Sequence, residues 1–334
     1  MKEVYPNIFL IEEKGLFRPS HNIYLIAGND GLIFDAGYGN RSALKQFFDQ
    51  IHQIEEYCKK QKIDFKTTRI LCSHAHSDHF SGLKSIKDKM GLSIILTEKI
   101  ASIIRDKGSF NNSFQTDGYE DNLKIRRKNI RKLRNFFRNL GERTVYKRIF
   151  GLSYLSNPDK IISEKTELMI NGQLWKIFSS PGHSPDHISL YNKEKGILFS
   201  GDNVLFMRST WLGPPESNLT EYLETIQKYQ NLPNLRIILP AHGEIIRNPE
   251  ESLAAILERM KEREDQVLNA ILTHSKQGIS PKNIIKIIYS KKRLIVRIIA
   301  RGWIILTLKM LEDKNIIRRK TTKRKVLFFP VKSD

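Results

Sequence analysis

Cysteine is nearly absent from this sequence: only Cys58 and Cys72 occur among its 334 residues. Two thiols are too few for the disulfide frameworks that stabilise small secreted domains, so that class of protein is excluded. Cys72 lies in the apolar run RILCS, which predicts a buried and chemically inert thiol. We therefore expect a protein of a reducing compartment and predict a cytoplasmic location.

Long uninterrupted apolar runs are also missing. The best candidate for a membrane-spanning helix, Leu294–Leu311, contains three basic residues, Arg297, Arg301 and Lys309. Each charge costs roughly 2.5–3.5 kcal/mol in the middle of a membrane, so three of them argue strongly against a span. The N-terminus, MKEVYPNIFLIEEKG, has neither a basic segment nor a long apolar one, and we expect no signal peptide. The sequence therefore predicts a soluble protein with no membrane partner.

Acidic residues are scarce relative to basic ones: 36 Asp and Glu stand against 56 Lys and Arg, and the net charge is +20. The excess lies in two segments, with eleven basic residues and one acidic residue in Lys124–Arg148, and sixteen and two in Lys276–Lys325. Such segments favour a polyanionic partner such as single-stranded nucleic acid, with Arg126, Arg127 and Arg131 as candidate contacts. A general enrichment of lysine on every surface is the alternative interpretation.

Apolar runs alternate with turns and helical patterns over much of the chain, which predicts an α/β fold. Residues 100–156 break this alternation with a basic, mostly helical segment, which we interpret as an insertion. From residue 249 the pattern becomes three helices followed by a two-stranded hairpin, which is the order of a winged helix. We therefore predict one domain over residues 1–248 and a winged-helix-like domain over residues 249–334.

Histidines and aspartates gather directly after the β-like runs. The residues in these positions are Asp35, His74, His76, Asp78, His79, His183, Asp202 and His242. Strand-end loops often form sites because the rigid sheet positions their exposed side chains. Imidazole and carboxylate together suit zinc, whereas carboxylates alone suit magnesium or calcium. The run His-x-His-x-Asp-His at residues 74–79, with three further ligand types in matching turns, therefore predicts a metal site.

This pattern resembles the metallo-β-lactamase superfamily, whose five motifs occur in order from Asp35 to His242. The resemblance implies an αββα sandwich and a dinuclear site with two Zn²⁺ per chain, which Mn²⁺ or Fe could replace. It implies that one metal is bound by His74, His76 and His183, the other by Asp78, His79 and His242, and that Asp202 bridges the two. Asp78 and Asp202 would serve catalysis, and Asp35 and His187 would orient the ligands.

Two metals about 3.5–4 Å apart can share a bridging water and lower its pKa toward about 7, which gives a hydroxide that attacks the substrate. This predicts a metal-dependent hydrolase that needs no protein nucleophile. Three other histidines, His21, His52 and His274, have no ligand context, and we expect surface or packing roles for them.

The stretch PGHSPDHISLY, the GDN and PAHG turns and the C-terminal helices resemble a lactamase-like subfamily with a C-terminal winged-helix domain. That subfamily includes single-strand endoribonucleases and acyl-thioester hydrolases. We expect first a nuclease acting on single-stranded RNA or DNA, and second a small-molecule ester or thioester hydrolase of the glyoxalase II kind. A winged-helix nucleic-acid-binding protein with an inactive hydrolase core is the third alternative, against which the complete ligand set argues. The winged helix could also form a homodimer interface.

Overall fold

The computed structural model describes residues 1–15, 19–113, 119, 123, 149–205, 210–290, 294–322 and 325–331. Within these residues the larger sheet has seven strands, which lie side by side in chain order. They are β1 (Lys2–Tyr5), β2 (Ile8–Glu13), β3 (His21–Ile26), β4 (Gly31–Phe34), β5 (Thr67–Leu71), β6 (Ser93–Thr97) and β7 (Lys160–Ile162). β1 to β4 pair antiparallel, and β4 to β7 pair parallel.

The second sheet has five strands among the described residues, in the order β12-β11-β10-β9-β8. They are β8 (Glu167–Ile170), β9 (Gln173–Ser179), β10 (Ile188–Asn192), β11 (Ile197–Gly201) and β12 (Ile237–Pro240). All pairs are antiparallel except β11 and β12, which run parallel. Both sheets are therefore mixed, and each has parallel strands whose carboxyl ends share one edge.

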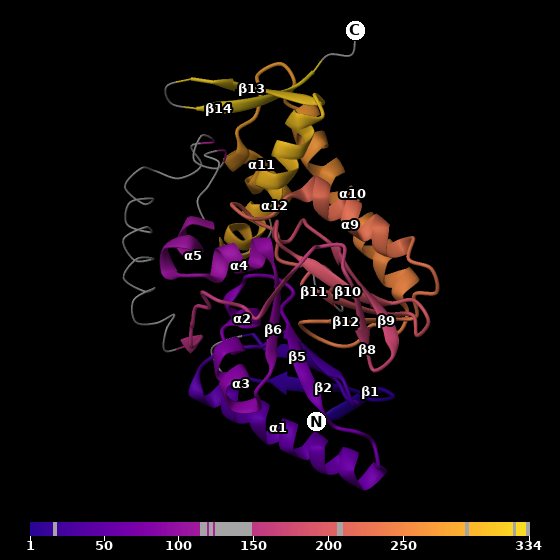
Figure 1. The fold of residues 1–334 in the computed structure, drawn as a ribbon. Helices are drawn as coiled ribbons and strands as arrows, with labels where there is room; N and C mark the ends of the chain where they lie inside the picture. The colour runs from indigo at the N-terminus through magenta and orange to yellow at the C-terminus, as the bar shows by residue number, and fades with distance from the viewer. Residues whose placement is uncertain are drawn as a thin grey trace.

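Helices cover the outer faces of both sheets (Figure 1). The helices of the described residues are α1 (Arg41–Gln61), α2 (Ser77–Phe80), α3 (Leu83–Met90), α4 (Glu98–Ile104), α5 (Lys107–Ser113), α9 (Leu219–Gln230), α10 (Pro249–Leu272), α11 (Pro281–Ile288) and α12 (Leu294–Asp313). α1 and α3 pack on the larger sheet, whereas α9 and the first half of α10 pack on the smaller one. The result is a helix–sheet–sheet–helix arrangement of mixed sheets.

Helix α1 illustrates how the sequence builds the outer layer. The Asn40 side chain accepts a hydrogen bond from the Ala43 backbone N–H at 3.0 Å and so caps the first turn. Phe47, Ile51 and Ile54 follow at helical spacing and are buried against the larger sheet. The helix ends at Gln61, and the left-handed conformation of the next residue, Lys62, turns the chain back toward β5.

Aromatic side chains fill the space between the two sheets. The Phe199 ring of β11 contacts the rings of Tyr24 and Phe34 in the larger sheet, with centroids 5.3 and 5.2 Å apart. On its own sheet it contacts Trp175, at 5.5 Å. Because these side chains are fully buried, they hold the sheets together as one core.

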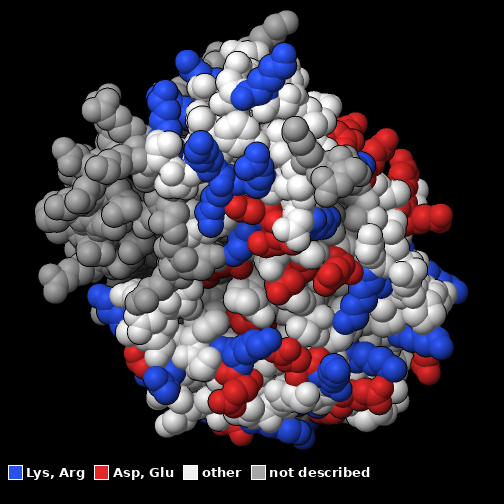
Figure 2. Space-filling view, turned by 90° about the horizontal axis from the view of Figure 1, so that it is seen from above, with Lys and Arg blue, Asp and Glu red and all other residues white. Residues whose placement is uncertain are grey.

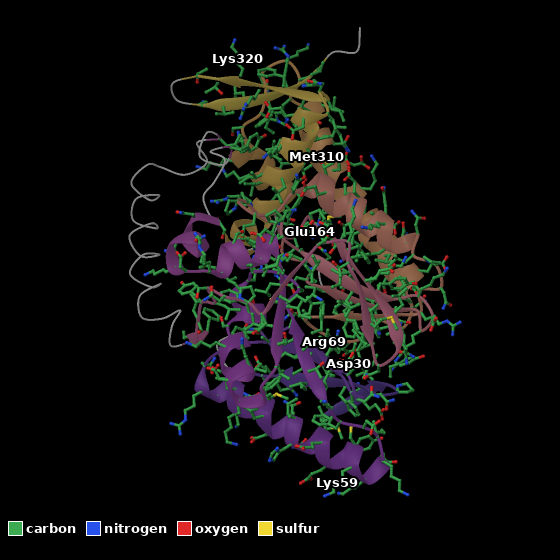
Figure 3. The ribbon with its side chains drawn as sticks, in the orientation of Figure 1. Asp30, Lys59, Arg69, Glu164, Met310 and Lys320 are labelled. Carbon is green, nitrogen blue, oxygen red and sulfur yellow. The ribbon has the colours of Figure 1, made fainter. Side chains whose placement is uncertain are left out.

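An ion pair lies near the amino ends of the parallel strands β4 and β5 of the larger sheet. Arg69 of β5 lies 2.6 Å from the carboxylate of Asp30, which precedes β4, and also donates to the Met169 carbonyl at 2.9 Å. Figure 3 shows the two labelled side chains together in the lower half of the molecule. The ion pair thus marks the edge of the sheet that carries the amino ends of the parallel strands. The loops at the carboxyl ends of β4, β5, β11 and β12 therefore lie at the opposite edge.

The C-terminal unit, residues 249–331, contains α10, α11, α12 and the hairpin β13 (Ile317–Thr321) and β14 (Val326–Pro330). The second half of α10 packs with α11, α12 and the hairpin around their own apolar cluster. The first half of α10 and the residues Leu306 and Met310 of α12 pack instead with α9 on the smaller sheet. The long helices α10 and α12 therefore contribute to two apolar clusters, the one inside the C-terminal unit and the one on the smaller sheet, and so join the unit to the rest of the protein.

The predicted insertion at residues 100–156 is described only in part. Its first residues form the end of α4 and all of α5. Tyr119 donates a hydrogen bond to Glu312 at 2.9 Å, and Leu123 packs in the cluster of the C-terminal unit. The basic segment 124–148, with the predicted contacts Arg126, Arg127 and Arg131, lies outside the described residues.

Figure 2 shows the molecule from the side of the C-terminal hairpin. Lysine and arginine side chains gather in the upper left of this face, and acidic side chains follow its right-hand rim. Among the described residues, no helix combines the length and the apolar character that crossing a membrane requires.

Candidate metal centre

The strand-end loops bring all seven predicted metal ligands into two adjacent groups. One group contains His74, His76, His183 and Asp202, and the other contains His21, Asp78, His79 and His242. Within each group one ligand atom per residue lies within 4.8 Å of the others. The division reproduces the predicted assignment of each residue to one of two metal positions, with His21 as an addition.

In the first group, His183 lies close to the other three residues. Its Nε2 lies 3.0 Å from Nδ1 of His76 and 3.4 Å from Oδ2 of Asp202. The His74 ring stands 4.4 Å from the His76 ring and 5.1 Å from the His183 ring, measured between centroids. One nitrogen atom of each of the three imidazoles therefore lies within 4.8 Å of a carboxylate oxygen of Asp202.

The second group meets the other oxygen of the same carboxylate. Oδ1 of Asp202 lies 3.4 Å from Nε2 of His79 and 3.4 Å from Nε2 of His242. Nε2 of His242 also lies 3.3 Å from Oδ2 of Asp78. Asp202 thus stands between the two groups with one oxygen toward each, as a shared ligand requires.

The outward nitrogen of each predicted histidine ligand has a hydrogen-bond partner. Nδ1 of His74 lies 3.0 Å from the Ser73 hydroxyl. His183 and His242 donate through Nδ1 to backbone carbonyls, at 2.9 Å to Trp211 and at 2.5 Å to Ser20. Bonds of this kind fix the tautomer and the ring orientation, so that the other nitrogen points inward.

Carboxylates hold the two remaining rings. His79 donates through Nδ1 to Asp35 at 2.9 Å, and His76 donates through Nε2 to Glu216 at 3.0 Å. Asp35 is fully buried and adopts a left-handed conformation, with φ at 69°. It also accepts the Ser73 backbone N–H at 2.7 Å, so it orients both a ring and the loop that begins at His74. This is the position in which the predicted role of Asp35 is possible.

His187 contacts the backbone of Asp202, and its ring lies 5.0 Å from the His74 ring between centroids. Its Nε2 accepts the Asp202 N–H at 3.2 Å, and its Nδ1 lies 2.8 Å from the Ser180 hydroxyl. Gly201 leaves room for this contact, because a Cβ there would come within 2.4 Å of the His187 ring. The orienting role of His187 stays a prediction.

Burial and neighbouring charges shift the titration of these groups in opposite directions. Burial lowers the pKa of His183 to about 4. Burial also opposes protonation of His242, but the carboxylates of Asp202 and Asp78 outweigh it and raise the pKa of that ring to about 9. Burial would raise the pKa of Asp202, yet the charges of His242 and His79 hold it well below the usual range. The cluster is an array of coupled charges.

A divalent metal fits the donors that this cluster leaves unsatisfied. Among the described residues, Nε2 of His74, Nε2 of His79 and Oδ1 of Asp202 are buried without a hydrogen-bond partner. Burying such atoms unpaired costs about 1–3 kcal/mol each, and all three face the interior of the cluster. Imidazole nitrogens and carboxylate oxygens are donors for transition metals. The two groups could therefore hold a dinuclear site.

Sequence reasoning missed two residues of this site. His21 was expected to pack or lie on the surface, but it is buried in the second group. It begins β3, and because β3 runs antiparallel to β4, its first residue lies at the edge where β4 ends. Glu216 stands 140 residues beyond its partner His76, and no motif marked it. His52 is exposed, and the ring of His274 is hydrogen-bonded to the Ala270 carbonyl.

Comparisons with known proteins place these observations in a wider group. The model of the metallo-beta-lactamase superfamily matches residues 17–242. The chain is 29% identical over 156 residues to the beta-lactamase-like protein 2 homolog of Caenorhabditis elegans, a match that covers 47% of this chain and 50% of that protein. It is 31% identical over 121 residues to an atrochrysone carboxyl ACP thioesterase of Aspergillus fumigatus, with coverage of 35% and 37%. The chain thus spans half or less of the length of these curated relatives.

A third relative, the probable metallo-hydrolase YqgX of Bacillus subtilis, is 25% identical over 224 residues, which are 66% of this chain and 83% of that protein. Among solved structures, a beta-lactamase domain protein from Burkholderia ambifaria aligns with a TM-score of 0.74 at 18% identity, covering 99% of this chain and 93% of its own. A metallo-beta-lactamase family protein from Thermus thermophilus gives 0.69 at 18% identity, with coverage of 98% and 100%. At this identity the structural likeness establishes the fold alone.

Proposed function

The chain belongs to the metallo-beta-lactamase superfamily as a metallo-hydrolase, and on that basis we propose that it is a two-zinc enzyme acting on an ester bond. One observation carries the proposal. The carboxylate of Asp202 stands between two groups of inward-facing imidazoles, and three of the buried donor atoms have no other partner. Two zinc ions bound there would supply an activated water near neutral pH and would polarise the oxygen of the scissile group.

The protein's own side chains would then act by position. Asp202, held through its backbone N–H by His187, shares its two oxygens between the metal positions. Asp78 lies beside His242 and supplies the carboxylate of the second position. Asp35 and Glu216 fix the rings of His79 and His76. No serine, threonine or cysteine nucleophile is needed in this scheme.

For the substrate we propose first a phosphodiester of single-stranded nucleic acid. The support is the distribution of charge, because the segments Lys124–Arg148 and Lys276–Lys325 contain twenty-seven of the 56 basic residues and only three acidic ones. In the described part, Arg318, Arg319 and Lys320 of β13 are exposed. Basic surfaces of this kind follow the phosphates of a single strand. In the proposed complex, Arg126, Arg127 and Arg131 belong to the strand-binding surface.

An acyl thioester is the second candidate substrate. The support is a relative that is named as an acyl carrier protein thioesterase and is 31% identical over 121 residues. A thioester would use the same cluster, because attack at a carbonyl carbon and attack at phosphorus both need an activated water and a polarised oxygen.

We further propose that the C-terminal unit is a winged helix that shapes the mouth of the site. The order α10, α11, α12, β13, β14 is the order of that motif. Gly302 of α12 lies against the loop that follows β11 and that we take as one wall of the site. A Cβ at residue 302 would come within 2.7 Å of the Leu212 carbonyl in this loop. The preceding residue, Trp211, lies closer to the cluster, and its carbonyl accepts a hydrogen bond from the His183 ring.

The two free, buried thiols support a cytoplasmic setting for the protein.

The proposal is tested by loading purified metal-free protein with zinc and measuring turnover of two substrates. One is a labelled single-stranded RNA, and the other is a short acyl thioester. We expect about two zinc per chain and cleavage of the RNA. Cleavage of the thioester alone would select the second candidate, and a folded protein that binds no metal would refute the two-metal site.

A further inference from the structure

His21 is a buried histidine with no hydrogen-bond partner among the described residues. Its side chain is fully inaccessible, and neither Nδ1 nor Nε2 is satisfied. An unsatisfied buried polar atom costs about 1–3 kcal/mol, so a histidine that served only packing would be less favourable here than leucine or phenylalanine. The ring therefore requires a partner that the described part of the chain does not supply.

The backbone on both sides of His21 is tied to the loop of His242. Ser20 accepts the hydrogen bond from Nδ1 of His242 at 2.5 Å. The Asn22 N–H donates to the Ala241 carbonyl at 2.8 Å, and the Asn22 side chain donates to Gly243 at 2.8 Å. The His21 side chain is consequently fixed against the second group of ligands rather than free to turn away.

The ring of His21 lies close to two of the predicted ligands within that group. Its centroid lies 4.4 Å from that of His79 and 5.1 Å from that of His242. A nitrogen of His21 falls within the 4.8 Å cluster formed with Asp78, His79 and His242. No other described residue of the cluster accepts or donates a hydrogen bond to it.

We propose that His21 is an additional ligand of the second metal position, which rests on the two-metal site proposed above. The second position then draws on three imidazoles, the Asp78 carboxylate and one oxygen of Asp202. The first position draws on three imidazoles and the other oxygen of Asp202. Three imidazoles favour a transition metal over magnesium or calcium at both positions. The second position has one more protein donor, so it is the more saturated, and the first keeps more room for substrate.

The test compares metal binding by the wild type, His21→Leu and the control His274→Ala, whose ring lies outside both groups. The metal content of dialysed protein is measured by mass spectrometry. Affinities are measured by titrating Zn²⁺ against a chromophoric chelator. The visible spectrum of the Co²⁺-loaded protein reports the number of ligands, because absorption intensity falls as coordination rises above four. None of these readouts depends on turnover.

Loss of even an indirect partner of a metal typically costs about 10- to 100-fold in affinity. We therefore expect His21→Leu to bind the metal of the second position at least about tenfold less tightly, with a stronger visible spectrum, while the other metal and the His274→Ala control match the wild type. Two metals bound by His21→Leu with wild-type affinity and an unchanged Co²⁺ spectrum would overturn the assignment of His21 alone. A wild type that binds fewer than two metals would instead overturn the two-metal site.

Thermal unfolding of the metal-free proteins separates a lost ligand from a damaged fold. Leucine removes two unsatisfied nitrogens, so metal-free His21→Leu should unfold at or above the midpoint of the metal-free wild type. Added zinc should then raise the midpoint of the wild type more than that of the variant. Should His21→Leu fail to fold, His21→Ala, which leaves room for solvent, is measured in the same way and is held to the same outcomes.

Discussion

The metal centre and the C-terminal unit use polar residues in opposite ways. At the centre, His74, His79 and Asp35 are fully inaccessible, and each outward atom has a defined partner. In the C-terminal unit the charged side chains of β13 are exposed, and the buried cluster is almost wholly apolar. Buried polar groups are sensitive to the loss of any partner, whereas an exposed charge contributes little by itself. Loss of a single side chain should therefore be felt more at the centre than on the exposed surface of the C-terminal unit.

The largest effects are expected from single ligands of the centre. His76→Ala and Asp78→Ala should each lower turnover by roughly 10²–10³-fold or more, since each removes a group that holds charge at the reacting centre. The fold should persist, because His76 precedes the short helix α2 and Asp78 lies in it, both outside the sheets. Turnover and circular dichroism are measured together, with His52→Ala as the exposed control. Near wild-type turnover in either variant would contradict the two-metal proposal.

Removing a partner of a ligand should have an intermediate effect. Glu216→Gln keeps the size of the side chain but removes the charge that orients the His76 ring. We expect metal affinity at one position to fall by about 10–100-fold, and turnover at saturating zinc to fall less. Chelator titration gives the affinity, and Glu244→Gln, at an exposed glutamate in the PAHG loop, is the matched control. Equal affinities in the two variants would show that Glu216 does not position the ring.

A substitution at the contact between the two regions should have a smaller effect on the site. Gly302→Ala places a Cβ against the Leu212 carbonyl, and relieving that clash should cost about 1–3 kcal/mol of stability. Because Leu212 follows Trp211 in the wall of the site, we expect a rise in KM with an unchanged metal content. Thermal unfolding and steady-state kinetics measure the two effects. An unchanged KM would show that the C-terminal unit does not shape the substrate-binding part of the site.

The smallest effect on chemistry is expected from the charges of the basic segment 124–148. Neutralising Arg126, Arg127 and Arg131 together should flatten the slope of log affinity against log salt by about two units, because each phosphate contact on a single strand contributes about −0.7. Turnover of a small thioester should stay unchanged. Filter binding of a labelled oligonucleotide across a salt series measures the slope. The same slope in the wild type and the triple variant would exclude this segment from the strand-binding surface.

The alternation of strands and helices and the chemistry of the strand ends could be predicted from local patterns. The mixed α/β fold is confirmed, and so is membership of the family that the motifs resembled. The grouping of His74, His76 and His183 apart from Asp78, His79 and His242 is what the structure displays. The identity of the metal and the winged-helix assignment stay predictions, as does the role of the basic segment. None of these follows from backbone geometry.

His21 and Glu216 show where local patterns end. His21 stands before an apolar strand with no second ligand type near it, and Glu216 lies in a loop after two prolines. Their positions in the site depend on contacts between distant parts of the chain. His21 reaches the site because β3 pairs with β4, and Glu216 reaches it because the loop after β11 contacts the loop after β5. A residue that acts through a neighbour far away in sequence leaves no periodic or spaced signal.

By itself the sequence determined which residue types follow each strand, because hydrophobic alternation and turn residues are encoded within a few positions. That was enough to predict seven candidate donors and, through the resemblance of their motifs, the family. Only the tertiary structure decided that Asp202 turns one oxygen toward each group, that His21 joins one of them, and that Gly302 brings the C-terminal unit to the wall of the site. These relations are fixed by the packing of two sheets and two long helices, and packing is a property of the whole chain that no short stretch of residues contains.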